Sequence, residues 1–337
     1  MSTFASTVRA RVVAEHRGLL EIAGIPGISF GLPRGVFADA DDPLSRPAVG
    51  DFVQVLPQVG SDVALIEAIE PRKSVFVRRQ VGRRARVQVV AANVDTVFVV
   101  MGLDGDFNPR RVLRYQVAIA DAGAEAVIVL NKCDLDPTGR QGDDLAGTVV
   151  RVSAASGLGL DRLEPWLGPG RTVAVVGSSG VGKSTLVNRL LGEARQATGG
   201  VRAGDDKGRH TTTHRALFEL PGGAALIDTP GMRELGLVGE GDGLDEVFAD
   251  VQDLVAGCRF RDCHHQGEPG CAVEAALRRG VLDADRWASY QKLQREAAFE
   301  SQRHDEAAQR LAARALQKRF TEKIGRERDR RRLGWKA

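Results

Sequence analysis

The chain has 337 residues, enough for two or three domains with separate hydrophobic cores. A hydrophobic share of 43% and a charged share of 27% describe an ordinary globular protein, without an internal repeat or a low-complexity tract. The formal net charge is only +3, so its distribution along the chain says more than its sum. Residues 1–11 lack the apolar core of a signal peptide, and no apolar run reaches membrane-spanning length. We therefore expect a cytoplasmic protein with no membrane partner.

Two regions are rich in basic residues. The first contains no acidic residue and consists of Arg72, Lys73, Arg78, Arg79, Arg83, Arg84 and Arg86; the second covers the end of the chain, including residues 326–332. Such regions suit a polyanion such as RNA, because neutralising its phosphates releases counterions. Solvated surface charge is the alternative interpretation of each region.

The first 75 residues consist of short β-type runs separated by Gly and Pro. The runs lie at 8–13, 18–22, 51–55 and 64–69. Many short strands with frequent turns predict a small barrel, and we favour an OB-type barrel. Barrels of this type commonly bind nucleic acid, but a fold alone does not establish a function.

From about residue 87, apolar strands alternate with helical patterns. Strand-like runs occur at 94–101, 126–130, 148–152, 173–176 and 224–227, and a helical stretch begins behind Asn108 and Pro109. This alternation predicts a parallel sheet covered by helices on both faces.

One stretch of this region has the spacing of a phosphate-binding P-loop, G-x-x-x-x-G-K-S. It comprises Gly177, Ser178, Ser179, Gly180, Val181, Gly182, Lys183, Ser184 and Thr185, and it lies between a strand and a helix. Its glycines let backbone N–H groups close around a phosphate, while Lys183 can reach the β- and γ-phosphates. The Ser184 hydroxyl can bind Mg²⁺. A merely flexible loop is the alternative.

Two loops predict that the base is guanine. Asn131, Lys132, Cys133 and Asp134 form N-K-x-D at the end of a strand, where the Asp carboxylate can accept both donors of a guanine edge. Adenine lacks that donor pair, which disfavours an ATPase or a kinase. After the next strand, Ser153 and Ala154 can present the Ala154 N–H to the guanine oxygen.

The remaining nucleotide elements come later in the chain. Asp228 and Gly231 belong to a D-x-x-G motif, in which the Asp holds Mg²⁺ through water and the Gly N–H senses the γ-phosphate. A preceding Gly- and Asp-rich segment predicts a switch loop, with Thr212 as the expected second Mg²⁺ ligand. Met232 offers no hydrogen bond to an attacking water, so we expect slow intrinsic hydrolysis. His210 is the candidate catalytic group, and a solvated loop histidine is the alternative.

All five guanine-nucleotide elements are thus present in permuted order, with base recognition first. A site is built in space, so this order leaves the pocket intact. The permutation also places a following domain directly after D-x-x-G, which couples that domain to the nucleotide state.

A cluster of Cys and His follows this region. Cys258, Cys263 and Cys271, with His264 or His265, supply three thiolates and one imidazole for a closed tetrahedral zinc site of structural type. Three cysteines cannot all pair in disulfides, and spacing alone does not choose the histidine. Beyond residue 285 a polar helical pattern predicts a long amphipathic helix, which either binds RNA or packs on the core.

The combination of motifs resembles the RsgA family of circularly permuted bacterial GTPases. Further matching stretches are 91–95, 208–213 and 258–271, so the resemblance covers most of the chain. It implies an N-terminal OB-fold, zinc ligands Cys258, Cys263, His265 and Cys271, and a contribution of His210 to hydrolysis. The family also has an apolar residue in place of the usual Gln, and Met232 is an unusual choice of that residue. The charged C-terminal extension is long for the family, and the role of the last thirty residues stays open.

Together these inferences predict a multidomain α/β protein. We expect an OB-fold β-barrel at 1–75, a circularly permuted P-loop GTPase domain at 76–245, and a zinc-binding helical domain with a basic tail at 246–337. The motifs predict hydrolysis of GTP to GDP and phosphate, and the resemblance implies that the small ribosomal subunit stimulates it during late maturation of that subunit. The alternative is a nucleotide-gated rRNA-binding checkpoint that uses hydrolysis only for release. The expected cofactors are one structural Zn²⁺ and Mg²⁺ with GTP, and we expect a monomer.

Overall fold

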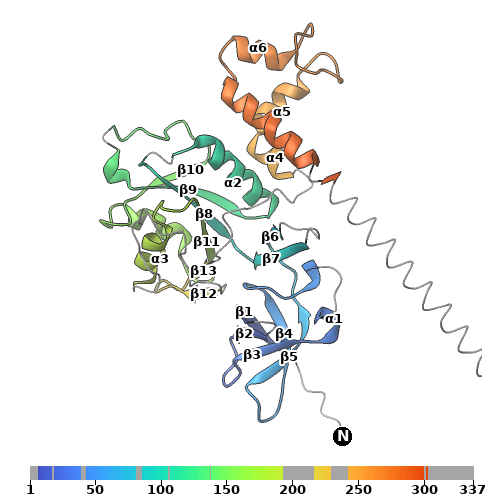
Figure 1. Ribbon diagram of the computed structural model, residues 1–337, viewed down its shortest axis with the longest axis vertical. Coiled ribbons are helices and arrows are strands. Elements are labelled where there is room, and N and C mark those ends of the chain that lie inside the picture. The colour runs from blue at the N-terminus through green and yellow to red at the C-terminus, as the bar shows by residue number, and fades with distance from the viewer. Residues whose placement is uncertain are drawn as a thin grey trace, which may run out of the picture.

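The computed structural model describes residues 7–16, 19–38, 43–80, 86–104, 107–136, 138–192, 216–228, 242–299 and 301–302. A barrel, a sheet flanked by helices and a group of helices follow one another along the long axis (Figure 1). Within these ranges, no helix combines the length and the apolar character that crossing a membrane requires.

The N-terminal part is a closed five-stranded barrel. Its strands are β1 (Val8–His16), β2 (Leu19–Ala23), β3 (Phe30–Pro33), β4 (Phe52–Pro57) and β5 (Val63–Ile69). They pair in the order β1-β2-β3-β5-β4, and β4 pairs again with β1 to close the barrel. Alternate residues of β1, β2, β4 and β5 are buried, as expected of a sheet with one face on a core. The expected OB-type barrel is confirmed, and β3 is the strand that the sequence did not predict. A short helix α1 (Gly35–Ala38) and a 3-10 turn η1 (Pro43–Ser45) connect β3 to β4.

The central part is a sheet of six strands. They are β8 (Thr96–Gly102), β9 (Glu125–Asn131), β10 (Thr148–Arg151), β11 (Thr172–Val176), β12 (Ala216–Glu219) and β13 (Ala225–Asp228). Five of these strands are parallel and lie in the order β10-β9-β8-β11-β13. The sixth, β12, lies antiparallel to β13. The predicted parallel sheet is confirmed, whereas the antiparallel strand β12 was not predicted.

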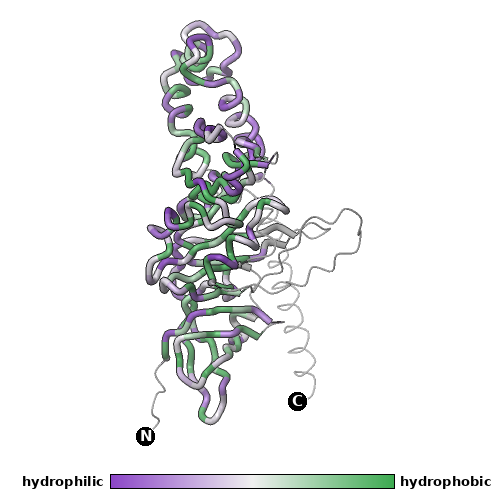
Figure 2. The backbone as a smooth tube through the Cα atoms, turned by 90° about the vertical axis from the view of Figure 1, so that its left-hand side faces the viewer, coloured by the Kyte–Doolittle hydropathy of each residue, from purple (hydrophilic) through white to green (hydrophobic). Residues whose placement is uncertain are grey.

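Helices cover both faces of this sheet. On one face, α2 (Pro109–Asp121) packs over β8 and β9, and on the other α3 (Lys183–Leu191) follows β11. Every residue of β8 and β11 is therefore buried, which explains their continuous apolar sequence. Figure 2 shows hydrophobic stretches along the strands in the middle of the molecule. The short 3-10 helices η2 (Cys133–Leu135) and η3 (Leu160–Trp166) lie in the connections.

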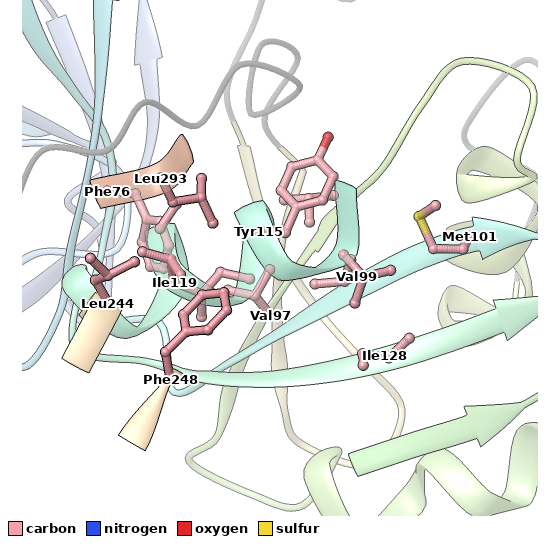
Figure 3. Close-up of a cluster of buried hydrophobic side chains, with 14 of the residues drawn as sticks. Phe76, Val97, Val99, Met101, Tyr115, Ile119, Ile128, Leu244, Phe248 and Leu293 are labelled. Atoms are coloured by element: carbon pink, nitrogen blue, oxygen red, sulfur yellow. The ribbon is translucent and has the colours of Figure 1, made fainter. Parts of the chain in front are cut away.

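The C-terminal helices pack on the outer side of α2. They are α4 (Asp242–Val247), α5 (Ala249–Ala256), α6 (Ala272–Arg278) and a further helix over 284–299. Figure 3 shows Leu244, Phe248 and Leu293 gathered with Ile119 and Tyr115 of α2 in one buried cluster. This cluster also holds strand residues of the sheet, so the helices and the sheet share a continuous core.

Polar contacts fix the same packing. The Gly243 N–H donates to the Asp121 carboxylate of α2 at 2.7 Å. Arg110 pairs with Asp285 at 2.7 Å, and Arg114 of α2 pairs with Glu296 at 3.0 Å. Helix α2 is therefore joined to the C-terminal helices along its whole length.

A separate hairpin of β6 (Val75–Gln80) and β7 (Arg86–Ala92) follows the barrel. It carries Arg78, Arg79 and Arg86 of the first basic region. Arg83 and Arg84 lie outside the described residues, as do residues 303–337 of the second basic region.

Strand pairing and an arginine join the barrel to the central sheet. Strands β1 and β12 meet at one pair, Ala14 and Ala216, which merges barrel and sheet into one eleven-stranded sheet. Beside this bridge, Arg11 of β1 donates to the Thr172 hydroxyl at the start of β11, at 2.6 Å. The Asn93 amide donates to the Gly50 carbonyl at 3.2 Å, and its oxygen accepts from the Lys73 N–H at 2.9 Å.

Arg72, the first residue of the basic region, is part of a buried ion pair. It donates to both oxygens of the fully buried Asp51, each at 2.7 Å, and its other donors meet the carbonyl oxygens of Leu44 and Arg46. Asp51 also accepts the Ala48 N–H at 2.7 Å. A bidentate, fully hydrogen-bonded pair of this kind compensates the desolvation of both charges. Arg72 is thus structural, whereas the basic region as a whole had suggested a nucleic-acid surface.

We expect Arg72→Ala to lower the free energy of unfolding by roughly 3–5 kcal/mol, because it leaves a buried carboxylate without its cation. Urea denaturation of wild type and variant measures the loss. Arg34→Ala is the matched control in the barrel, since Arg34 is 57% exposed in its pair with Glu67 and should contribute about 1 kcal/mol or less. Equal effects of the two substitutions would contradict the structural role of Arg72.

Candidate nucleotide site and metal cluster

The P-loop connects β11 to α3, and its conformation requires glycine at two places. Gly177 has φ of +142°, and a Cβ there would lie 2.2 Å from the Val100 carbonyl oxygen. Gly182 has φ of +93°, and a Cβ there would lie 2.3 Å from the Asn131 side-chain nitrogen. Both the backbone conformation and the close approach exclude other residues. The loop is therefore shaped by its neighbours on β8 and β9.

Lys183 begins α3 and points back over the loop. Its ammonium group donates to the carbonyl oxygen of Ser178. Because an ammonium has three donors, it can keep this bond and still bind a phosphate oxygen. Ser184 follows Lys183 in the first turn of α3, where unpaired N–H groups and the helix dipole favour an anion.

The Asn131 side chain links the P-loop to both base-recognition loops. Its amide donates to the Val181 carbonyl at 2.8 Å, and its oxygen accepts the Ala154 N–H at 2.8 Å. Asn131 is 2% exposed and stands at the end of β9. The structure therefore brings N-K-x-D, Ser153-Ala154 and the P-loop together around one amide. The Ala154 N–H, which we expected to meet the guanine oxygen, here serves this amide.

Lys132 braces the same arrangement from the outside. Its ammonium donates to the Gly180 carbonyl of the P-loop at 2.8 Å and pairs with the Asp104 carboxylate. Its φ of +62° is unusual for a residue with a side chain, and it turns the chain from β9 into η2. Sequence reasoning missed Asp104, because it lies outside any motif and 28 residues before Lys132.

Cys133 and Asp134 occupy the first turn of η2. The Asp134 side chain is exposed, as a carboxylate that receives a base from solvent must be. Burial raises the pKa of the Cys133 thiol, and the charge of Asp134 raises it further. Cys133 is therefore a protonated thiol at neutral pH.

The segment after the base loop is held by Asp136. A hydrogen bond from the Thr138 hydroxyl, with others from nearby N–H groups, keeps the pKa of Asp136 below its ordinary value. Arg151 of β10 adds a contact to Asp136 at 3.2 Å and another to Asp143 at 2.7 Å. These bonds fix the loop between β9 and β10 beside the candidate base site. A cavity of about 240 Å³ opens there, lined in part by Cys133, Arg151 and Arg162.

A further contact to the P-loop comes from α2. Arg111, in the first turn of that helix, donates to the Ser178 hydroxyl from 67 residues away. Sequence reasoning missed this residue as well. Its only sequence signal was an arginine next to a predicted helix start at Asn108 and Pro109.

Several predicted residues cannot be placed. Gly231, Thr212 and His210 lie outside the described residues, and so does Met232. Asp228 is the last residue of β13, and only its backbone is described. Their roles therefore stay predictions.

The predicted metal cluster is assembled. Ligand atoms of Cys258, Cys263, His265 and Cys271 all lie within 4.8 Å of one another. The Cys258 and Cys271 sulfurs are 4.0 Å apart, and each lies 3.5 Å from His265 Nδ1. A tetrahedral Zn²⁺ with ordinary bond lengths places two sulfurs about 3.8 Å apart and a sulfur and a nitrogen about 3.5 Å apart. The cluster fits this ion, and all four cysteines of the chain are unbridged.

Helices hold the cluster on two sides. Cys271 caps the N-terminus of α6, where its sulfur accepts the Glu274 N–H at 3.4 Å. The His265 ring meets the edge of Trp287, which stacks on Tyr290 of the last described helix. The metal cluster is thus tied to the same buried cluster that covers α2.

Comparison with known proteins agrees with these findings. The family model described as RsgA GTPase matches residues 69–238. A protein of Opitutus terrae named small ribosomal subunit biogenesis GTPase RsgA is 49% identical over 312 residues, which cover 88% of this chain and 85% of that protein. A protein of the same name from Xanthomonas oryzae is 46% identical over 323 residues, covering 91% and 84% of the two chains.

Two solved structures share the fold. The crystal structure of YjeQ from Thermotoga maritima superposes with a TM-score of 0.64 at 26% identity, covering 87% of this chain and 99% of that one. YloQ, described as a circularly permuted GTPase, gives a TM-score of 0.60 at 21% identity, covering 90% and 98%. The fold of this chain therefore matches that of both solved structures. The chain is a GTP hydrolase and belongs to the RsgA GTPase family.

Proposed function

We propose that this GTPase binds the small ribosomal subunit and hydrolyses GTP during late maturation of that subunit. Binding to the subunit stimulates the hydrolysis. The single observation that carries the nucleotide half of this proposal is the Asn131 amide, which joins the P-loop to both base loops. The ribosomal half rests on the names of the relatives and on the basic residues of the β6–β7 hairpin.

The residues of the site divide the work on GTP. Lys183 and the N–H groups of the P-loop stabilise the negative charge on the β- and γ-phosphates as the bond to the γ-phosphate breaks. Asp134 accepts the two donors of the guanine edge, and Lys132 and Asn131 hold that loop against the P-loop. His210 and Gly231 are the proposed groups on the γ-phosphate side.

Mg²⁺ fits this donor set through hydroxyl oxygens. Ser184 stands next to Lys183 in the first turn of α3, as a metal ligand beside the phosphates should. We assign Thr212 as the second hydroxyl and Asp228 as a ligand through water. Bound Mg²⁺ supplies positive charge to the phosphates.

The Cys/His cluster can hold one metal ion, and we propose that the ion is Zn²⁺. Three thiolates and an imidazole suit zinc and leave no open position for catalysis. The proposed role is structural, because the cluster links α6 to the helix over 284–299.

We retain the domain limits 1–75, 76–245 and 246–337 as part of the proposal, together with a monomeric state and a cytoplasmic location. The shared core of α2 with the C-terminal helices supports treating the last two domains as one body during binding. The proposed rRNA partner matches the basic residues of the hairpin.

We expect GTP turnover to rise strongly when purified small ribosomal subunits are added, and ATP turnover to stay near background. Lys183→Ala should abolish the stimulated rate by removing the phosphate cation. Phosphate release is measured with and without subunits, and large subunits serve as the control. Equal use of ATP, or a GTP rate that subunits do not change, would contradict the proposal.

Replacing Asp134 by Asn should shift the preference from guanine to xanthine nucleotides. The amide presents a donor where the carboxylate had accepted, so a base with an oxygen at that edge pairs better. Competition binding with GDP and xanthosine diphosphate measures the shift. Asp144→Asn, an exposed carboxylate in the loop after the base motif, is the matched control and should change neither affinity. A preference that Asp134→Asn leaves unaltered would rule out the base assignment.

Protein purified without chelators should contain about one zinc ion per chain, as four ligands predict. Cys271→Ser should lose most of that metal and lower the thermal midpoint, since the ion holds α6 in place. Cys133→Ser is the matched control, because Cys133 lies in the base loop and should not affect metal content. Elemental analysis decides, and full metal content in Cys271→Ser would exclude this cluster as the site.

A further inference from the structure

Arg111 reaches the P-loop from a helix that no nucleotide motif includes. It lies in the first turn of α2, half buried, and its guanidinium donates to the Ser178 hydroxyl. The helix start is fixed independently, because the Asn108 side chain accepts the Arg111 N–H at 3.3 Å. The side chain therefore projects from a rigid base toward the loop.

Ser178 is held at two points by two cations. Lys183 binds its carbonyl oxygen, while Arg111 binds its hydroxyl. The loop is otherwise rich in glycine, with Gly177 on one side and the exposed Gly180 on the other. Glycine-rich backbone loses much entropy when it is ordered, so a contact that orders it beforehand favours ligand binding.

We propose that Arg111 is a positioning residue of the phosphate loop, acting through the Ser178 hydroxyl to hold the loop ready for the β-phosphate. The proposal rests on the proposed function, since it assumes a guanine nucleotide in the loop. P-loop N–H groups surround the α- and β-phosphates, and a monophosphate lacks the second of these. The contact at Ser178 should therefore affect the affinity for a diphosphate more than that for a monophosphate.

The chemistry of the side chain suits this role. A guanidinium is charged at every physiological pH and presents rigidly arranged donors, so the contact does not depend on protonation. Lysine at the same place would keep the charge but lose the planar arrangement of donors. Packing of α2 on the sheet and on α4 holds the helix from which Arg111 projects.

The test compares GDP with GMP in Arg111→Ala, Arg111→Lys, Ser178→Ala and the double variant Arg111→Ala/Ser178→Ala. Affinities are measured by displacement of a fluorescent GDP analogue in the full-length protein with Mg²⁺. We expect Arg111→Ala to reduce the ratio of GDP affinity to GMP affinity roughly tenfold, because the variant loses one charge-assisted hydrogen bond. GMP affinity should change less than about twofold, and Arg111→Lys should recover only part of the loss.

Ser178→Ala tests whether Arg111 acts by positioning the loop through this hydroxyl or only through its positive charge. It keeps the Cβ and removes only the hydroxyl, and we expect it to match Arg111→Ala. The double variant should then be no worse than either single one, because both remove the same contact. Arg110→Ala is the matched control, an adjacent arginine of the same helix turn that pairs with Asp285 and should leave the GDP preference unchanged.

The outcomes are distinguishable. Unchanged GDP preference in Arg111→Ala, additive losses in the double variant, or an equal loss in Arg110→Ala would each overturn the role of Arg111. Absence of saturable GDP binding by the wild-type protein would instead overturn the proposed function itself.

Discussion

The nucleotide site depends on the hydrogen bonds of one amide. Asn131 donates to the P-loop at Val181 and accepts from Ala154, so three loops that are distant in sequence share one fixed centre. An aspartate in place of Asn131 would put a carboxylate against the Val181 carbonyl with no donor between them. A buried unpaired group of this kind is costly in free energy. The three loops follow β9, β10 and β11 of one parallel sheet, whose carboxyl ends lie along the same edge. The reversed order of the motifs therefore leaves the geometry of the pocket intact.

Helix α2 connects this centre to the C-terminal helices, which position the Cys/His cluster. One side of α2 packs on β8 and β9, and its outer side packs on Leu244, Phe248 and Leu293 (Figure 3). Its first turn carries Arg111 against the P-loop and Arg110 against the C-terminal helix. Helix α2, thirteen residues long, therefore contacts both the phosphate loop and the C-terminal helices.

Much of the fold could be predicted from the sequence, because its signals are local. The strand–loop–helix of the P-loop, the apolar runs of the parallel strands and the Cys/His spacing each lie within a short window. The contacts of Arg111 and Asp104 could not be predicted, since each joins residues far apart and follows no repeat. For Arg72 the local sequence signal was misleading. The basic run suggested a nucleic-acid-binding surface, but in the fold Arg72 pairs with the buried Asp51.

The permuted order has a consequence for the two segments that carry the predicted γ-phosphate contacts. The segment with Thr212 enters β12, and β12 meets barrel strand β1 at Ala14 and Ala216. The segment with Gly231 leaves β13 and enters α4, which packs on α2. One segment therefore ends at β12, which pairs with the barrel. The other ends at α4, which packs on α2. Along the chain, Thr212 is thus joined to a strand that pairs with the barrel, and Gly231 to a helix that packs on α2.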